Sequence, residues 1–254
     1  MAQNSAGRGA PTQAARPATS KKQKSADLDS VYATFVKTYG PLAEPTPTET
    51  LDVLFFALMM QDMGFRQCAK AFQTFKSQYV DWNEVRISGA TELQEVLKGA
   101  GDPLALALTM KEFLNRLFIE HHHVGIEFLH GKTATEVKNF FKKSPKIPDA
   151  VLSLILERNN DTAIFPLSAP MAEVVERLGW VDAGATVHKK SKDIYTKIPR
   201  PKLLEYYCYL LEHSRAPCTQ DRDALDCPAC DVRAVCPYPK KSKGQKATAK
   251  KSKR

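Results

Sequence analysis

Apolar side chains recur along the chain with the spacing of an α-helix. Val31, Tyr32, Phe35, Val36 and Tyr39 fall on one helical face. The same periodicity predicts further helical segments around residues 51–59, 65–78, 91–98, 103–120, 133–143, 150–157, 171–179 and 201–213. Alternating strand patterns and hairpin dipeptides are scarce. The pattern therefore predicts an all-α body.

Short polar stretches predict where these helices begin and end. Thr46-Pro47-Thr48-Glu49 has the form of a capping box with proline at the first helical position, so we expect it to open the helix over 51–59. Three other stretches, at residues 99–101, 158–161 and Gly184, are typical of loops. His121, His122 and His123 are consecutive, so their side chains diverge on a helix, and we expect a solvated helix end.

Length and composition fit a globular chain. With 254 residues, 43% hydrophobic and 26% charged, it suits one large domain or two small ones. No apolar run approaches the roughly 18 residues of a membrane span. The N-terminal residues also lack an apolar segment of the signal-peptide type. We therefore expect an intracellular protein, in the cytoplasm or nucleoid of a bacterium or in the nucleus or an organelle of a eukaryote.

The positive charge is concentrated in two terminal segments. Residues 1–25 hold five basic residues and no acid, and residues 240–254 hold eight. Removing that +13 from the net +9 leaves −4 for residues 26–239. Both segments lack the apolar content to fold, so we expect disordered basic arms that favour nucleic acid. The alternatives are a solubilising role, a nuclear localisation signal, or an organelle transit peptide at the N-terminus.

Four of the six cysteines are packed into nineteen residues. Cys218, Cys227, Cys230 and Cys236 are spaced C-x8-C-x2-C-x5-C, and four thiolates in so short a loop can surround one metal centre. Disulfides are disfavoured because nothing indicates an oxidising compartment. The spacing itself leaves zinc and an iron–sulfur cluster both open. The remaining two, Cys68 and Cys208, lie in helical segments and are expected to be buried apolar side chains.

The C-terminal motif resembles the end of endonuclease III, in the iron–sulfur branch of the helix-hairpin-helix (HhH-GPD) DNA glycosylase superfamily. The segment 210–218 reads L-L-E-H-S-R-A-P-C and is followed by the other three cysteines and Pro237-Tyr238. The first cysteine spacing is slightly longer than the usual one, which an exposed loop can absorb. Upstream, residues 54–75 resemble the family's early helix pair, and residues 171–180 resemble the helix after its catalytic aspartate.

The resemblance covers roughly residues 30–239. It implies a two-lobed all-α fold with double-stranded DNA in the cleft, and a [4Fe-4S] cluster held by Cys218, Cys227, Cys230 and Cys236. We expect a basic tail at 1–26, a helical body at 27–215, a cysteine loop at 216–239 and a Lys-rich tail at 240–254. We also expect a monomer.

The catalytic positions of the family are changed. Counting without gaps from Arg177-Leu178-Gly179, the family's V-D-T-H falls on residues 167–170 and its L-P-G-V-G-x-K-T-A falls on residues 144–152. Ala150 then stands at the nucleophilic lysine and Ser168 at the aspartate. Alanine has no lone pair to attack a sugar, and a neutral serine cannot supply the aspartate's charge. Ser168 is instead expected to be a helix N-cap.

The DNA-contacting turn is changed as well. Lys146-Ile147-Pro148 replaces the hairpin's Gly-Val-Gly, and Pro148 has no N–H to donate to a phosphate. Lys146 can contact phosphate only through its side chain. Gln61 matches the family's glutamine that fills the space of an extruded base, and equally fits a helix-surface residue. Asp149, Asp161 and Lys146 are the nearest substitutes for the lost catalytic groups.

Three functions follow as hypotheses. The leading one is a DNA-binding member of the base-excision repair superfamily that keeps the iron–sulfur architecture and lacks glycosylase and lyase chemistry. The second is an active glycosylase with relocated residues. The third is an interaction scaffold whose cluster senses redox state, an option kept open by the −4 charge of residues 26–239.

Overall fold

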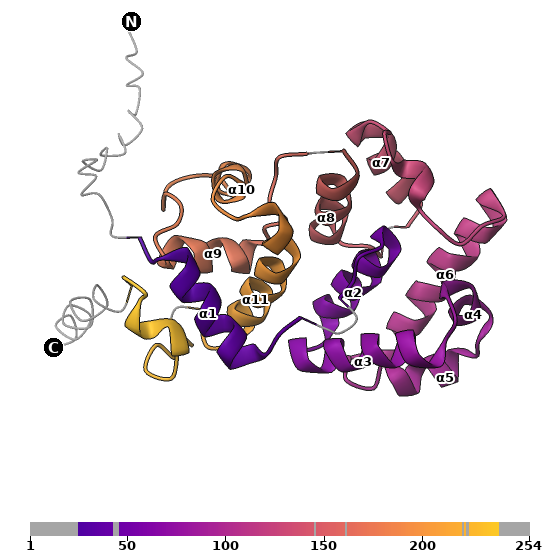
Figure 1. The fold of residues 1–254 in the computed structure, drawn as a ribbon, viewed down its shortest axis with the longest axis horizontal. Coiled ribbons are helices and arrows are strands. Elements are labelled where there is room, and N and C mark those ends of the chain that lie inside the picture. The colour runs from indigo at the N-terminus through magenta and orange to yellow at the C-terminus, as the bar shows by residue number, and fades with distance from the viewer. Residues whose placement is uncertain are drawn as a thin grey trace, which may run out of the picture.

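The computed structural model describes residues 25–42, 46–144, 146–160, 162–219, 221 and 224–238. Within these ranges the regular secondary structure is all helical and no β-strand forms (Figure 1). The prediction of an all-α, two-lobed fold is therefore confirmed. No helix in the described part of the chain is long and apolar enough to cross a membrane.

The larger lobe is built around one fully buried helix. Its helices are α2 (Thr50–Asp62), α3 (Phe65–Gln78), α4 (Trp82–Ile87), α5 (Ala90–Val96), α6 (Pro103–His121), α7 (Ala134–Phe141) and α8 (Asp149–Asn160), with a 3₁₀ turn at Glu127–Leu129. Helix α2 is apolar on all sides, so burial on every face is the arrangement its sequence favours. It packs against α3 and α8, while α6 packs against α4 and α5.

The smaller lobe joins the first helix to the C-terminal half of the chain. It consists of α1 (Leu28–Tyr39), α9 (Ala169–Arg177), α10 (Val187–Tyr195) and α11 (Leu203–Arg215), with 3₁₀ turns at Arg200–Lys202 and Asp231–Ala234. The apolar stripe of α1 meets tyrosines of α11, for example Tyr32 on Tyr206, with ring centroids 5.4 Å apart. The last of these turns lies against α1. Figure 1 shows the N-terminal and C-terminal segments of the described chain side by side.

The two lobes are tied together at the end of α2. Arg215 of α11 donates hydrogen bonds to the carbonyl oxygens of Met60 and of Met63, the second at 2.8 Å. The last carbonyls of a helix have no partner within the helix, so this guanidinium satisfies groups that would otherwise be orphaned. Helix α11 also packs against α2 and α3. The relative position of the lobes therefore depends on α11.

Several predicted boundaries were wrong. Helix α2 has Glu49 as its N-cap and begins at Thr50, so Pro47 is not the first helical residue. Of the four residues expected to form a loop at 158–161, the first three continue α8 to Asn160, and Asp161 lies outside the described residues. Helices α4 and α10 were not predicted, because their short polar sequences carry little apolar periodicity. Ala26, assigned to the basic tail, is buried, and its N–H donates to the Leu178 carbonyl at 2.8 Å.

Candidate nucleic-acid and cysteine sites

The turn between α7 and α8 occupies the place of the predicted hairpin. Two of its lysines are directed to acidic residues of α6: Lys146 Nζ lies 2.8 Å from Glu112 Oε2, and Lys143 Nζ lies 2.9 Å from Glu120 Oε1. Both lysine side chains are more than half exposed, so each pair is worth about 1 kcal/mol or less. Lys146 remains accessible at the surface, with its amine engaged by a carboxylate.

The other hairpin residues differ in their accessibility. Ile147 is buried, with 8% of its surface exposed, and Pro148 is half-buried. The Pro148 carbonyl accepts the Leu152 N–H at 3.0 Å, which starts the hydrogen bonding of α8. The backbone of this turn therefore serves the start of α8.

The two residues that the sequence register sets at the family's catalytic positions lie at the beginnings of two helices. Ala150 is the second residue of α8 and packs, half-buried, against the core. Ser168 is the N-cap of α9, and its Oγ accepts the Met171 N–H at 3.5 Å. The segment that leads into this cap is held by the Phe165 N–H, which donates a hydrogen bond to the Ser191 carbonyl at 3.2 Å. Ser168 therefore has the structural role expected of it.

The two described candidate substitutes, Lys146 and Asp149, are both exposed. Asp149 is exposed at the first position of α8, and Lys146 is paired with Glu112. Asp161 lies outside the described residues. So do residues 1–24 and 239–254, which make up most of the two predicted basic tails.

Gln61 is held by bonds within the protein. Its Nε2 donates to the Ala57 carbonyl at 3.2 Å and to the Tyr207 hydroxyl at 2.5 Å. Tyr207 lies on α11 and is fully buried, which raises the pKa of its hydroxyl. The amide of Gln61 thus links α2 to α11 across the junction of the lobes.

All four cysteines of the predicted motif line one small cavity of about 20 Å³. The lining consists of these thiols, apolar side chains, two arginines and a histidine: Val174, Arg177, Leu178, His213, Pro217, Cys218, Cys227, Cys230, Val232, Arg233, Cys236 and Tyr238. No carboxylate of the described residues belongs to this lining. Among the described residues, no group of three or more His, Cys, Asp or Glu side chains is arranged to hold a metal ion. A donor set of four soft thiols suits either zinc or an iron–sulfur centre.

Arg177 is the cation that approaches these thiols. Its side chain is 4% exposed, and its Nη1 donates to the Sγ of Cys218 at 3.3 Å and to the carbonyl oxygen of Thr219 at 2.7 Å. Burial raises the pKa of Cys218, and the nearby guanidinium offsets part of this rise. Sequence reasoning used Arg177 only to set the register. Its role gives no spacing signal, because it lies 41 residues before Cys218.

The remaining cysteines and histidines behave as predicted. Cys68 and Cys208 are fully buried, and burial raises the pKa of both thiols. His121 is the last residue of α6, and His122 is its C-cap with φ of 54°. The histidine run is therefore a helix end.

Similar proteins are known, although no family model matches the chain. A DNA glycosylase candidate of Arabidopsis thaliana, At3g47830, is 27% identical over 178 residues, which cover 68% of this chain and 59% of that protein. The DNA glycosylase/AP lyase ROS1 of the same plant is 22% identical over 178 residues, 62% of this chain and 12% of that one. The chain thus spans less than two thirds of the length of these relatives.

Solved structures share the fold. A non-covalent endonuclease III–DNA complex gives a TM-score of 0.53 at 14% identity and covers 85% of this chain and 96% of the other. A thermostable thymine-DNA glycosylase gives 0.54 at 16% identity, covering 89% and 100%. The architecture is therefore that of the endonuclease III-like, all-α glycosylases. The sequence similarity is to DNA glycosylases of the same kind, at 27% identity or less.

Proposed function

We propose that this protein binds double-stranded DNA on an endonuclease III-like scaffold and lacks the glycosylase and AP-lyase chemistry of its superfamily. The proposal rests on the two residues that the ungapped sequence register sets at the family's catalytic lysine and aspartate. Ala150 has no nucleophilic atom, and the hydroxyl of Ser168 is committed to the Met171 N–H. The nearest amine, Lys146, is paired with Glu112. In this account the protein is a pseudoenzyme of base-excision repair and acts as a monomer.

DNA affinity would come from the hairpin and the two basic tails. Lys146 offers an exposed side chain to a phosphate, with Gln61, Ile147 and Pro148 at the positions of the family's DNA contacts. The thirteen cations of residues 1–25 and 240–254 would release counterions on binding, which makes the affinity steeply dependent on salt.

A [4Fe-4S] cluster, with zinc as the alternative, would be held by Cys218, Cys227, Cys230 and Cys236. The support is the chemistry of the cavity, in which four thiols meet the cations of Arg177 and Arg233 and no carboxylate. When bound, either group would cross-link the cysteine loop at 216–239 within itself, and the iron–sulfur cluster would also supply a one-electron redox centre. Arg177 would hold the loop by its bonds to Cys218 and Thr219.

The test measures binding and base release on the same duplexes. Full-length protein is titrated against fluorescent duplexes that carry oxidised, alkylated, uracil or undamaged bases. We expect binding at physiological salt, an affinity that falls as salt rises, and no released base. Absence of DNA binding under these conditions would refute the proposal and favour the protein-interaction scaffold.

An active glycosylase is the second candidate, and the names of the relatives favour it. Of the two candidate acids, Asp149 and Asp161, the structure describes only Asp149. Its side chain is exposed beside Ala150 and therefore accessible to water. Release of any one base, lost on the substitution D149N, would establish this candidate. Release that persists in D149N would point to Asp161.

A further inference from the structure

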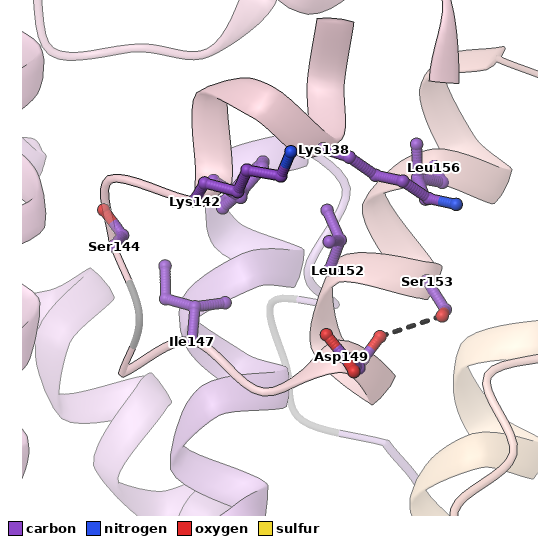
Figure 2. A pocket seen from close by; sticks show the side chains of 9 residues that line it. Lys138, Lys142, Ser144, Ile147, Asp149, Leu152, Ser153 and Leu156 are labelled. Atoms are coloured by element: carbon purple, nitrogen blue, oxygen red, sulfur yellow. Dashed lines mark hydrogen bonds between the residues drawn. The ribbon is translucent and has the colours of Figure 1, made fainter. Parts of the chain in front are cut away.

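A groove of about 630 Å³ opens between the end of α7 and the beginning of α8 (Figure 2). Its lining combines apolar side chains, two lysines, one acid and two serines: Lys138, Phe141, Lys142, Ser144, Ile147, Asp149, Leu152, Ser153 and Leu156. None of these residues belongs to the cysteine cavity. Ile147 is the one residue shared with the hairpin positions assigned to DNA.

The floor of the groove is apolar. The side chains of Ile147 and Leu152 rise into it from the turn and from α8 (Figure 2). Phe141 and Ile147 are at most 8% exposed and belong to the core, so the floor is held rigidly. A ligand that enters the groove meets hydrocarbon at its base and charge only at its walls.

One wall carries two cations that lack acidic partners. Lys138 lies on α7, and Lys142, four residues later, is the C-cap of that helix with helical backbone angles, so the two lie on the same helical face. The neighbouring Lys143 and Lys146 are paired with glutamates of α6, whereas Lys142 Nζ bonds the amide oxygen of Asn139 at 2.8 Å. Lys138 has no ion pair with any described residue. The groove therefore offers unneutralised positive charge beside an apolar surface.

We propose that this groove docks a segment of a partner protein in which acidic side chains stand beside apolar ones. Two carboxylates three or four residues apart on a helix match the spacing of Lys138 and Lys142, while the apolar residues between them cover Ile147 and Leu152. The chain's own tails do not fit, because residues 1–25 and 240–254 carry only basic charge. A nucleic-acid strand fits poorly, because its charged backbone would leave the apolar floor without a partner.

The test is a selection of 16-residue peptides displayed on phage against the immobilised full-length protein, run in parallel on the variant K138E/K142E. Peptides enriched on the wild type are synthesised and titrated by fluorescence anisotropy. K192E is the matched control, since it makes the same charge change at an exposed lysine of α10. A single-stranded DNA 16-mer is titrated against the same three proteins.

We expect enriched peptides that combine Asp or Glu with Leu, Phe or Ile, and at least tenfold weaker binding to K138E/K142E than to the wild type and K192E. L152D should weaken binding similarly while keeping the circular dichroism of the wild type. Enriched peptides that bind K138E/K142E equally well, or no enrichment at all, would overturn the proposal. Single-stranded DNA that binds the groove in place of peptides, with affinity lost in K138E/K142E, would assign it to nucleic acid instead.

Discussion

Ser168 Oγ lies 3.5 Å from the backbone nitrogen of Met171, and through this bond the hydroxyl caps the first turn of α9. The residue is therefore explained by helix capping. A helix N-cap and a catalytic group respond differently to substitution, so variants of Ser168 can tell the two roles apart.

Replacing Ser168 with alanine should lower the free energy of unfolding by about 1 kcal/mol, since one N–H at the start of α9 loses its acceptor. Replacing it with aspartate should leave stability close to that of the wild type, because aspartate is an equally good N-cap. Urea unfolding of the three proteins checks both statements. DNA affinity should not change in S168A, and a loss of affinity without a loss of stability would contradict the capping role.

Glu112 should restrain the DNA affinity of the hairpin. The substitution E112Q frees the amine of Lys146, so we expect tighter binding to duplex DNA and a logarithmic salt slope steeper by about one. E95Q makes the same charge change at an exposed residue of α5 and should produce neither effect beyond a small general gain. Equal gains in the two variants would show that Lys146 does not contact phosphate.

The four cysteines should act as one unit. Protein purified without oxygen should be brown, with visible absorbance and iron and sulfide in equal amounts, and C227S should lose both. Zinc in stoichiometric amount, with no colour, would assign the site to the alternative metal. C68S provides a cysteine control on α3 and should keep the colour. A brown C227S protein would remove Cys227 from the ligand set.

Alkaline pH should destabilise the larger lobe through Tyr79. Burial and the hydrogen bond to Glu92, at 2.8 Å, raise the pKa of Tyr79 to about 12. In the unfolded chain the tyrosine pKa is about 10, so this contribution is complete below about pH 10. It is then lost as pH rises toward about 12, the pKa in the folded protein. The free energy of unfolding, measured from pH 9 to pH 12, should therefore fall less steeply in Y79F than in the wild type.

The sequence predicted well those features that depend on local periodicity. The stripe beginning at Val31 and the segment 65–78 became α1 and α3 because apolar spacing alone decides such helices. The start of α2 was missed because Thr46 and Pro47 have the composition of a cap without its hydrogen bonds, whereas Glu49 is the N-cap with no side-chain bond at all. Capping depends on backbone geometry, which composition only suggests.

Contacts between residues far apart in the chain could not be predicted from the sequence. Nothing in the spacing of residues indicates that Glu112 meets Lys146, or that Arg177 donates to Cys218. Each pair joins segments more than thirty residues apart in the chain. The cysteine motif, in contrast, is compact in sequence, so its four thiols could be expected to lie close together, and they line one cavity.

The central claim, that this scaffold has no amine nucleophile, is tested most directly by borohydride trapping on a duplex that carries an abasic site. A Schiff base between protein and sugar would be reduced to a covalent complex, which migrates slowly on a denaturing gel. The variant A150K/S168D, which restores both family residues, should give such a complex and serves as the positive control. The account predicts no complex for the wild type under conditions where anisotropy shows it bound to the DNA. A covalent complex with the wild type would contradict the account.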